Sequence, residues 1–291
     1  MEIGEKDPRV VALAADLAKS TYTEMFKERF PDRHFEFGIQ EQNMMGVAAG
    51  LAATGKIPFA STFAVFAAGR AYDQVRLSIA YARFNVKIVA THGGLATGED
   101  GASHQMTEDI SLMGAIPGMI VLSASDYYST KSVLMAAYEH TGPVYVRLVR
   151  PAAPVIYGGV FEFKIGDVKK VRDGNDVAIV SYGYTLHKAL EAAELVRERG
   201  VDAAVYDFLT IKPIGARTLE ELAGYERVFV VEDHVVWGGL GVNLAGELDR
   251  YGAKTRVVTL GIRDSFGHSG TPEDLYRLFG LDPESIAKNI L

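Results

Sequence analysis

The sequence predicts an α/β protein built from two open α/β domains, and three observations support this fold class. Short β-branched apolar runs alternate along the chain with longer stretches of helical period. The runs are apolar throughout rather than alternating, as expected for strands of a mostly parallel sheet that is covered on both faces. The alternating pattern stops once, near residue 151, and then begins again. With 291 residues, the chain is long enough for two hydrophobic cores.

Residues 1–150 form the first predicted domain, with a mostly parallel sheet. The expected strands are Val10–Ala15, Phe35–Phe37, Ile57–Ser61, Val86–Thr91, Met119–Ser123 and Val144–Val149. The expected helices between them include Gln42–Ala53, Ala67–Phe84 and Asp126–Glu139. Ser125 precedes the last of these helices and is its expected N-cap, because a serine hydroxyl can accept a hydrogen bond from the first turn.

Residues 151–162 are the predicted linker, since Pro151, Pro154 and the Gly158-Gly159 pair interrupt any period. Residues 163–291 form the second predicted domain. Its expected strands are Val177–Ser181, Ala203–Asp207, Val228–Glu232 and Arg256–Leu260. Its expected helices are Leu186–Arg199 and Leu240–Arg250.

Composition excludes several classes of function. The net charge is −7 and no basic face or arginine-rich run occurs, so we expect no nucleic-acid partner. The apolar runs are short, and the polar segment Met1–Asp7 has no signal region, so we expect a cytoplasmic protein without a membrane partner. The sequence contains no cysteine, which excludes disulfides, thiolate catalysis and cysteine-bound metals.

The loop from Thr91 to Gln105 is the most informative segment for function. It follows a predicted buried strand, and ligands bind at the carboxyl ends of strands in open α/β sheets. It contains His92 and His104 together with a Glu-Asp pair and several glycines. Histidines beside carboxylates are suited to proton transfer near neutral pH. A solvated loop with glycine turns is the alternative interpretation.

Glu41 lies at the start of a strongly apolar helix. The simpler interpretation is that its charge complements the helix dipole. The functional interpretation is a buried carboxyl group with a raised pKa that shares a proton with a bound heterocycle.

Two further segments each allow two interpretations. Phe63 and Phe66 could form one wall of an aromatic pocket, although core packing is the commoner role of such residues. Arg150, in the run Arg147-Leu148-Val149-Arg150-Pro151, could clamp a phosphate or form an ordinary surface ion pair. We find no Walker loop, dinucleotide fingerprint or zinc-binding HExxH helix.

Taken together and in order, these segments resemble the transketolase family. Glu41, within Gly-Ile-Gln-Glu-Gln-Asn, resembles the family glutamate that hydrogen-bonds the N1′ nitrogen of the thiamine aminopyrimidine. Phe63 and Phe66 match the aromatic pocket of the pyrimidine ring. Asp16 matches an aspartate at the cofactor site. The resemblance therefore implies a pyrimidine-binding domain for thiamine diphosphate, followed by a transketolase-type C-terminal domain.

The same resemblance implies roles at the substrate. His92 and His104, which flank the run Gly-Glu-Asp-Gly, match the family's substrate loop and would assist proton transfers. Asp100 would bind a substrate hydroxyl. Ser20 and Arg150 match residues that hold the substrate phosphate.

By resemblance, the chain is the C-terminal subunit of a split transketolase, which moves a two-carbon ketol unit from a ketose phosphate to an aldose phosphate. The Gly-Asp-Gly and asparagine of the family's diphosphate domain are missing from this sequence. We therefore expect an N-terminal partner subunit to bind the diphosphate and Mg²⁺ (or Ca²⁺), and this chain to bind no metal. An assembly with two copies of each subunit is the expected form.

Two alternatives remain open at this stage. The run Arg70-Ala71-Tyr72-Asp73-Gln74 is also similar to the corresponding half of 1-deoxyxylulose-5-phosphate synthase. A non-catalytic subunit that keeps the fold is the other alternative. A 2-oxoacid dehydrogenase β subunit matches less well, because those proteins lack the histidine loop.

Overall fold

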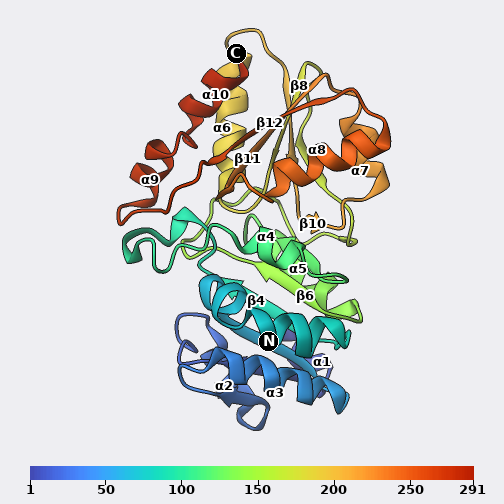
Figure 1. Cartoon of the computed structure of the whole chain (residues 1–291), viewed down its shortest axis with the longest axis vertical. Coiled ribbons are helices and arrows are strands. Elements are labelled where there is room, and N and C mark those ends of the chain that lie inside the picture. The colour runs from blue at the N-terminus through green and yellow to red at the C-terminus, as the bar shows by residue number, and fades with distance from the viewer.

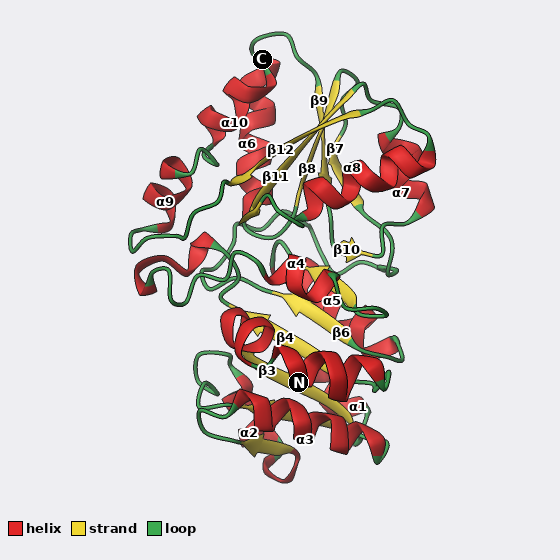
Figure 2. Ribbon diagram, in the orientation of Figure 1, coloured by secondary structure: helices red, strands yellow, loops and turns green.

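The computed structural model describes residues 1–291, and its two α/β units are arranged end to end along the long axis (Figure 1). Each unit has a central sheet with helices packed against it (Figure 2). This arrangement confirms the predicted fold class of two open α/β domains with mostly parallel sheets.

The first sheet has seven strands in the order β10-β5-β6-β4-β3-β1-β2. Apart from β10, neighbouring strands are parallel. The strands are β1 (Val10–Ala14), β2 (His34–Glu36), β3 (Ile57–Phe63), β4 (Lys87–Thr91), β5 (Ile120–Ser123) and β6 (Val144–Arg147). All six were predicted from the sequence, with ends displaced by one or two residues. Their side chains are largely buried, which is why they read as continuous apolar runs.

The helices of the first unit are α1 (Glu2–Lys6), α2 (Thr23–Arg29), α3 (Glu41–Ala53), α4 (Asp109–Gly114) and α5 (Tyr127–Glu139). The predicted α-helix Ala67–Phe84 is wrong in kind, because two π-helical segments, Val65–Arg70 and Gln74–Tyr81, replace it. An apolar period does not distinguish an α turn from a π turn, which pairs residues five apart.

The predicted N-cap Ser125 is also wrong, because Asp126 caps α5. The Asp126 Oδ1 atom accepts a hydrogen bond from the Ser129 N–H at 2.8 Å. The Ser125 hydroxyl instead donates to Asp207 Oδ1 at 2.7 Å. A carboxylate one residue further along therefore takes the capping role.

The second sheet has five strands in the order β12-β11-β8-β9-β7, of which only β7 is antiparallel. The strands are β7 (Lys169–Arg172), β8 (Val177–Ser181), β9 (Ala203–Asp207), β11 (Arg227–Val235) and β12 (Arg256–Ile262). The helices are α6 (Thr185–Arg197), α7 (Ala216–Leu222), α8 (Leu240–Tyr251), α9 (Pro272–Leu278) and α10 (Pro283–Ile290). Figure 1 shows α6, α9 and α10 on one side of this sheet and α7 and α8 on the other.

The two units are joined by more than the connecting segment. Strand β10 (Thr210–Lys212) follows β9 in the chain but pairs antiparallel with β5, and so extends the first sheet. One hydrophobic cluster of 39 buried residues includes Met106 and Ile110 from the first unit and Tyr182 and Tyr206 from the second. We therefore expect the two units to move as one body.

The segment between β6 and β7 contains no helix or strand. The Asp126 carboxylate anchors it, because Asp126 Oδ2 accepts hydrogen bonds from the Ile156 and Tyr157 amides, both at 2.9 Å. Among the helices of both units, none combines the length and the apolar composition that a membrane-crossing helix needs.

Candidate active site

The functional residues expected from the sequence lie at or beyond the carboxyl ends of parallel strands in the first sheet. Asp16 and Ser20 follow β1, Phe63 ends β3, and His92 follows β4. Because β1, β3 and β4 are parallel neighbours, these strands end at one edge of the sheet. This is the edge at which open α/β sheets bind ligands.

Glu41 is the first residue of α3, and its side chain is only 1% exposed. Its Oε2 atom accepts a hydrogen bond from Arg70 Nη1 at 2.8 Å. Arg70 comes from the first π-helical segment, and its guanidinium carbon also lies 4.2 Å from the centroid of the Phe66 ring. Glu41 is therefore a buried carboxylate that one cationic side chain holds in place. The contact between Arg70 and Glu41 was not predicted from the sequence.

Aromatic rings form the centre of the site. The Phe63 and Phe66 rings are stacked, with centroids 5.9 Å apart. The His92 ring lies parallel to Phe63 at a centroid distance of 3.6 Å. His104 lies edge-on to both phenylalanines, at 6.2 Å from Phe63 and 5.6 Å from Phe66. The loop histidines and the two phenylalanines therefore belong to one cluster, which reaches Glu41 through Arg70.

His92 is buried and has an unusual backbone conformation, with φ at 62°. The Thr97 hydroxyl donates to its carbonyl oxygen at 2.9 Å, and its Nδ1 atom lies 3.0 Å from Thr91 Oγ1. Burial, assisted by the positive charge of Arg150, lowers the pKa of His92 to about 4. The imidazole is therefore neutral at pH 7 and can accept a proton or donate one to a ligand.

Asp100 and Arg150 lie together on the rim of the same loop. Arg150 Nη1 is 3.4 Å from Asp100 Oδ1 and 3.6 Å from Glu99 Oε2, and it donates to the Thr97 carbonyl at 2.7 Å. The Arg150 side chain is 41% exposed. In this state Arg150 forms the ion pair that was the alternative interpretation of the sequence, while it remains accessible to an anion from solvent.

Asp16 and Ser20 are exposed residues that follow β1, the neighbour of β3. Asp16 is exposed with φ at 59°, and its N–H donates to Glu36 Oε1 at 2.6 Å. The same Glu36 oxygen accepts hydrogen bonds from the amides of Phe37 and Gly38 and so organises the turn before α3. The exposed Ser20 hydroxyl forms no hydrogen bond within the chain. No hydrogen bond or ion pair joins Asp16 or Ser20 to the residues of the aromatic cluster.

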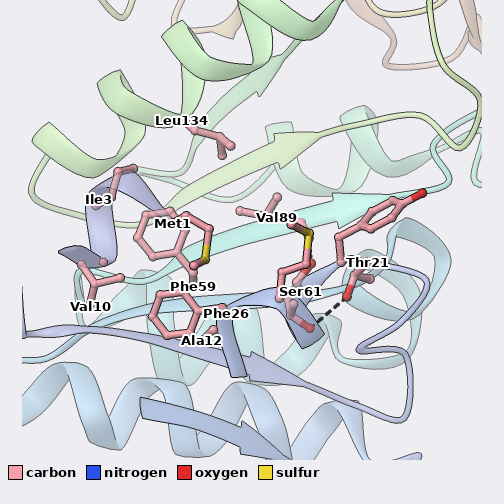
Figure 3. Close-up of a pocket in the computed structure, with 14 residues that line it drawn as sticks. Met1, Ile3, Val10, Ala12, Thr21, Phe26, Phe59, Ser61, Val89 and Leu134 are labelled. Atoms are coloured by element: carbon pink, nitrogen blue, oxygen red, sulfur yellow. Dashed lines mark hydrogen bonds between the residues drawn. The ribbon is translucent and has the colours of Figure 1, made fainter. Parts of the chain in front are cut away.

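An apolar cavity of about 300 Å³ lies elsewhere, between α1, α2 and strands β1, β3 and β4 (Figure 3). Val10, Phe26, Phe59 and Leu134 are among its lining residues. Apart from Tyr22, no titratable side chain lines it. This cavity lacks the groups needed for proton transfer, so we do not assign the chemistry to it.

No group of three or more histidine, aspartate or glutamate side chains is arranged to hold a metal ion. Among the predicted site residues, Glu41, Phe63, Phe66, His92 and His104 form one cluster, in which Arg70 supplies the positive charge.

Family models match both units of the chain. The model described as "Transketolase, pyrimidine binding domain" matches residues 1–155, and "Transketolase, C-terminal domain" matches residues 166–286. A putative transketolase C-terminal section from Methanocaldococcus jannaschii is 47% identical, with all of this chain and 92% of that protein covered. A 6-deoxy-6-sulfo-D-fructose transketolase subunit from Clostridium is 38% identical, with 99% of this chain and 89% of that protein covered.

Among solved structures, a split-gene transketolase described as an inactive β4 tetramer superposes with a TM-score of 0.92. It is 44% identical, and the match covers 99% of this chain and 93% of that one. The chain therefore belongs to the transketolase family and corresponds to the C-terminal subunit of a split transketolase.

Proposed function

We propose that the chain is the subunit of a transketolase that carries the pyrimidine-binding half of a shared thiamine-diphosphate site. The enzyme would transfer a two-carbon ketol unit from a ketose phosphate to an aldose phosphate. One observation carries the proposal. The buried Glu41 carboxylate, the paired rings of Phe63 and Phe66 and the two loop histidines lie in one connected cluster.

The chemistry of these residues fits the aminopyrimidine end of the cofactor. A flat heterocycle needs an apolar aromatic wall, which Phe63 and Phe66 supply. Its ring nitrogen needs a carboxyl partner shielded from water, and Glu41 is the buried carboxyl group of the cluster. Asp16 would contact the cofactor from the neighbouring strand. When bound, thiamine diphosphate supplies the electron sink for carbon–carbon bond cleavage.

The chain's own residues would then act on the sugar. His92 and His104 would hydrogen-bond the oxygens of the donor and move protons to and from them. Asp100 would bind a hydroxyl group and help select its configuration. Arg150 would exchange its pairs with Asp100 and Glu99 for the stronger bidentate contact with a phosphate, which the Ser20 hydroxyl would also bind. Such remote contacts orient the substrate.

The likeness to a split-gene transketolase supports a second subunit as partner. In the proposal, that N-terminal subunit binds the diphosphate and Mg²⁺ (or Ca²⁺), and two copies of each subunit form a cytoplasmic assembly. The related structure described as an inactive tetramer of one subunit supports the view that this half alone does not turn over substrate.

Ketol transfer from xylulose 5-phosphate to ribose 5-phosphate tests the proposal. The assay contains thiamine diphosphate and Mg²⁺ and compares this chain, the diphosphate-domain subunit and the two co-expressed. We expect turnover only in the mixture. Turnover by this chain alone would overturn the shared site. Formation of 1-deoxyxylulose 5-phosphate from pyruvate and glyceraldehyde 3-phosphate by the mixture, without ketol transfer, would instead favour the synthase.

A further inference from the structure

A buried charge network joins the two units directly beneath the His92 loop. Arg147, the last residue of β6, is completely buried and lies between two buried carboxylates. Its Nε atom donates to Asp109 Oδ2 at 3.1 Å, and its Nη1 atom donates to Asp233 Oδ1 at 3.0 Å. Asp109 belongs to α4 of the first unit and Asp233 to β11 of the second. The network therefore crosses the junction between the units.

Each carboxylate has a second partner that holds it in place. The Tyr145 hydroxyl donates to Asp109 Oδ2, and the Tyr276 hydroxyl donates to Asp233 Oδ2, both at 2.8 Å. Fully buried charges are tolerated only when they are paired and hydrogen-bonded in this way. Because several partners restrain each group, the guanidinium of Arg147 has a defined position.

The backbone of the His92 loop rests on this network. A Cβ atom on Gly93 would lie 2.8 Å from Arg147 Nε, and one on Gly94 would overlap the Asp233 carboxylate. The Gly94 N–H donates to the Met106 carbonyl at 2.7 Å, and Arg147 Nη2 is 3.5 Å from the same oxygen. His92 immediately precedes these glycines. The position of its ring therefore depends on how closely the Gly93 and Gly94 backbone packs on Arg147 and Asp233.

The second unit also holds the far end of the loop. Gln105 Nε2 donates to the His268 carbonyl at 2.8 Å and to the Gly98 carbonyl at 3.0 Å. The loop that carries the two histidines therefore lies against the second unit at Gly94 and is hydrogen-bonded to it at Gln105.

We propose that Arg147, Asp109 and Asp233 are positioning residues that hold the His92 loop in its working geometry. Through them, the C-terminal domain controls the position of a loop that belongs to the first domain. The kinetic consequence of this inference rests on the proposed function, whereas the effect on His92 itself does not.

Two adjacent acids of β11 provide a matched test. Asp233 faces Arg147, whereas Glu232 accepts hydrogen bonds from the Leu240 and Gly241 amides of α8 and from Tyr182, at 2.8 to 3.1 Å. Both are completely buried, and neither the side chain of Glu232 nor its partners belong to the His92 loop. Glu232→Gln therefore controls for the general cost of changing a buried acid in this strand.

The first experiment follows the His92 imidazole by NMR during a pH titration of the intact chain, with the signal assigned through His92→Gln. The groups that act on this imidazole are Arg150, Asp100 and His104, and burial holds its pKa near 4. Asp233→Asn should loosen the loop, admit water and raise the pKa of His92 toward its ordinary value of 6.5. Glu232→Gln should leave it unchanged. Equal responses in both variants, or none in either, would overturn the proposal.

If Asp233→Asn does not fold, Tyr276→Phe and Tyr182→Phe form a milder pair. Each removes one hydroxyl, from Asp233 and from Glu232 respectively. Only Tyr276→Phe should raise the pKa of His92, and equal titration of His92 in the two variants would contradict the proposal.

The second experiment measures steady-state kinetics of the two-subunit enzyme. Asp233→Asn should lower kcat roughly tenfold to a hundredfold, because small misplacements of reacting groups have effects of that size. The Kd of thiamine diphosphate should change less than kcat, since no hydrogen bond or ion pair joins Glu41, Phe63 or Phe66 to the network. A wild-type mixture without turnover would count against the proposed function, while the NMR titration would still decide the positioning role.

Discussion

Arg147 and Arg150 lie three residues apart along the chain, yet the regions around them have opposite character. Arg147 is fully buried at the junction of the two units, and two carboxylates and two backbone carbonyls surround it. Arg150 is 41% exposed on the rim of the His92 loop, with carboxylates at 3.4 and 3.6 Å. The guanidinium at the junction is fully paired with groups of the chain, whereas the one at the rim is partly open to solvent.

This difference indicates that the buried junction holds the site in place, whereas the exposed rim can bind a ligand. A buried, fully paired guanidinium cannot release its partners for a ligand without a large cost. An exposed guanidinium with weak pairs can exchange them for a phosphate at little cost. The same contrast distinguishes Asp233, which binds Arg147 and Tyr276, from Glu41, whose single partner is the half-exposed Arg70. We therefore interpret the rim as the working surface and the junction as the structure that shapes it.

The largest expected effect concerns Glu41, the buried carboxylate beside the aromatic rings. Glu41→Gln keeps the size of the side chain but removes the proton-sharing carboxylate. Turnover of the two-subunit enzyme should fall by about 10²–10⁴-fold, the usual range for loss of a general acid or base. Steady-state kinetics measure the loss, and an unchanged thermal transition of the chain shows that the fold is intact. Full activity in the variant would remove Glu41 from its assigned role.

The two arginines should differ strongly in their effect on stability. Arg147→Met leaves two buried carboxylates without their cation and should lower the free energy of unfolding by about 3–5 kcal/mol. Arg150→Met breaks only exposed pairs and should change it by no more than about 1 kcal/mol. Urea denaturation of both variants measures the two values. Similar losses would show that the contrast between junction and rim is wrong.

His92 should make stability depend on pH. Its pKa is about 4 in the folded chain and 6.5 ordinarily, so the unfolded chain binds the proton first as the pH falls. The folded state should therefore lose up to about 3 kcal/mol between pH 6.5 and 4, and nothing above that window. We would compare wild type with His92→Gln by urea denaturation at pH 8 and at pH 4.5. A stability difference that does not change with pH would argue against a buried neutral histidine.

The smallest expected effects on stability come from substitutions at two glycines. Gly93 lies against Arg147, whereas a Cβ atom on Gly46 of α3 would meet no atom within 4 Å. Gly93→Ala should destabilise the chain by about 1–3 kcal/mol through overpacking. Gly46→Ala should stabilise it by about 0.5–1 kcal/mol, because alanine favours the helix. Thermal unfolding of the two variants decides whether the close approach at Gly93 is specific to the junction.

Much of the first domain was predictable because its strands are buried on both faces and therefore appear as apolar runs. Strand β10 was not predicted, since Thr210–Lys212 is short and pairs with β5, a strand distant in sequence. The two π-helical segments were predicted as one α-helix, because the spacing of their apolar residues does not distinguish a π-helix from an α-helix. Helices α9 and α10 begin at Thr271-Pro272 and Asp282-Pro283, and these N-cap and proline pairs were available signals.

Glu41, Phe63, Phe66, His92 and His104 were named from the sequence and lie together in the structure, but the residues that support them were not predicted. The contact of Glu41 with Arg70 and the network of Arg147 depend on residues that only the fold brings together. One feature of the sequence could have indicated the buried network. Glu232, Asp233 and His234 occur in succession at the end of an apolar strand, and buried polar groups need internal partners. The roles assigned to Asp16 and Ser20, like those of the other site residues, stay predictions.

Calorimetric titration with thiamine diphosphate and Mg²⁺ tests the central claim most directly. The titration is made on this chain, on the diphosphate-domain subunit and on the two together, and then on the mixture with Glu41→Gln. The account predicts weak or no binding to either subunit alone and tight binding to the mixture. It also predicts weaker binding to the mixture that carries the variant. Tight binding to this chain alone, or identical binding with Glu41→Gln, would contradict a cofactor site shared between two subunits.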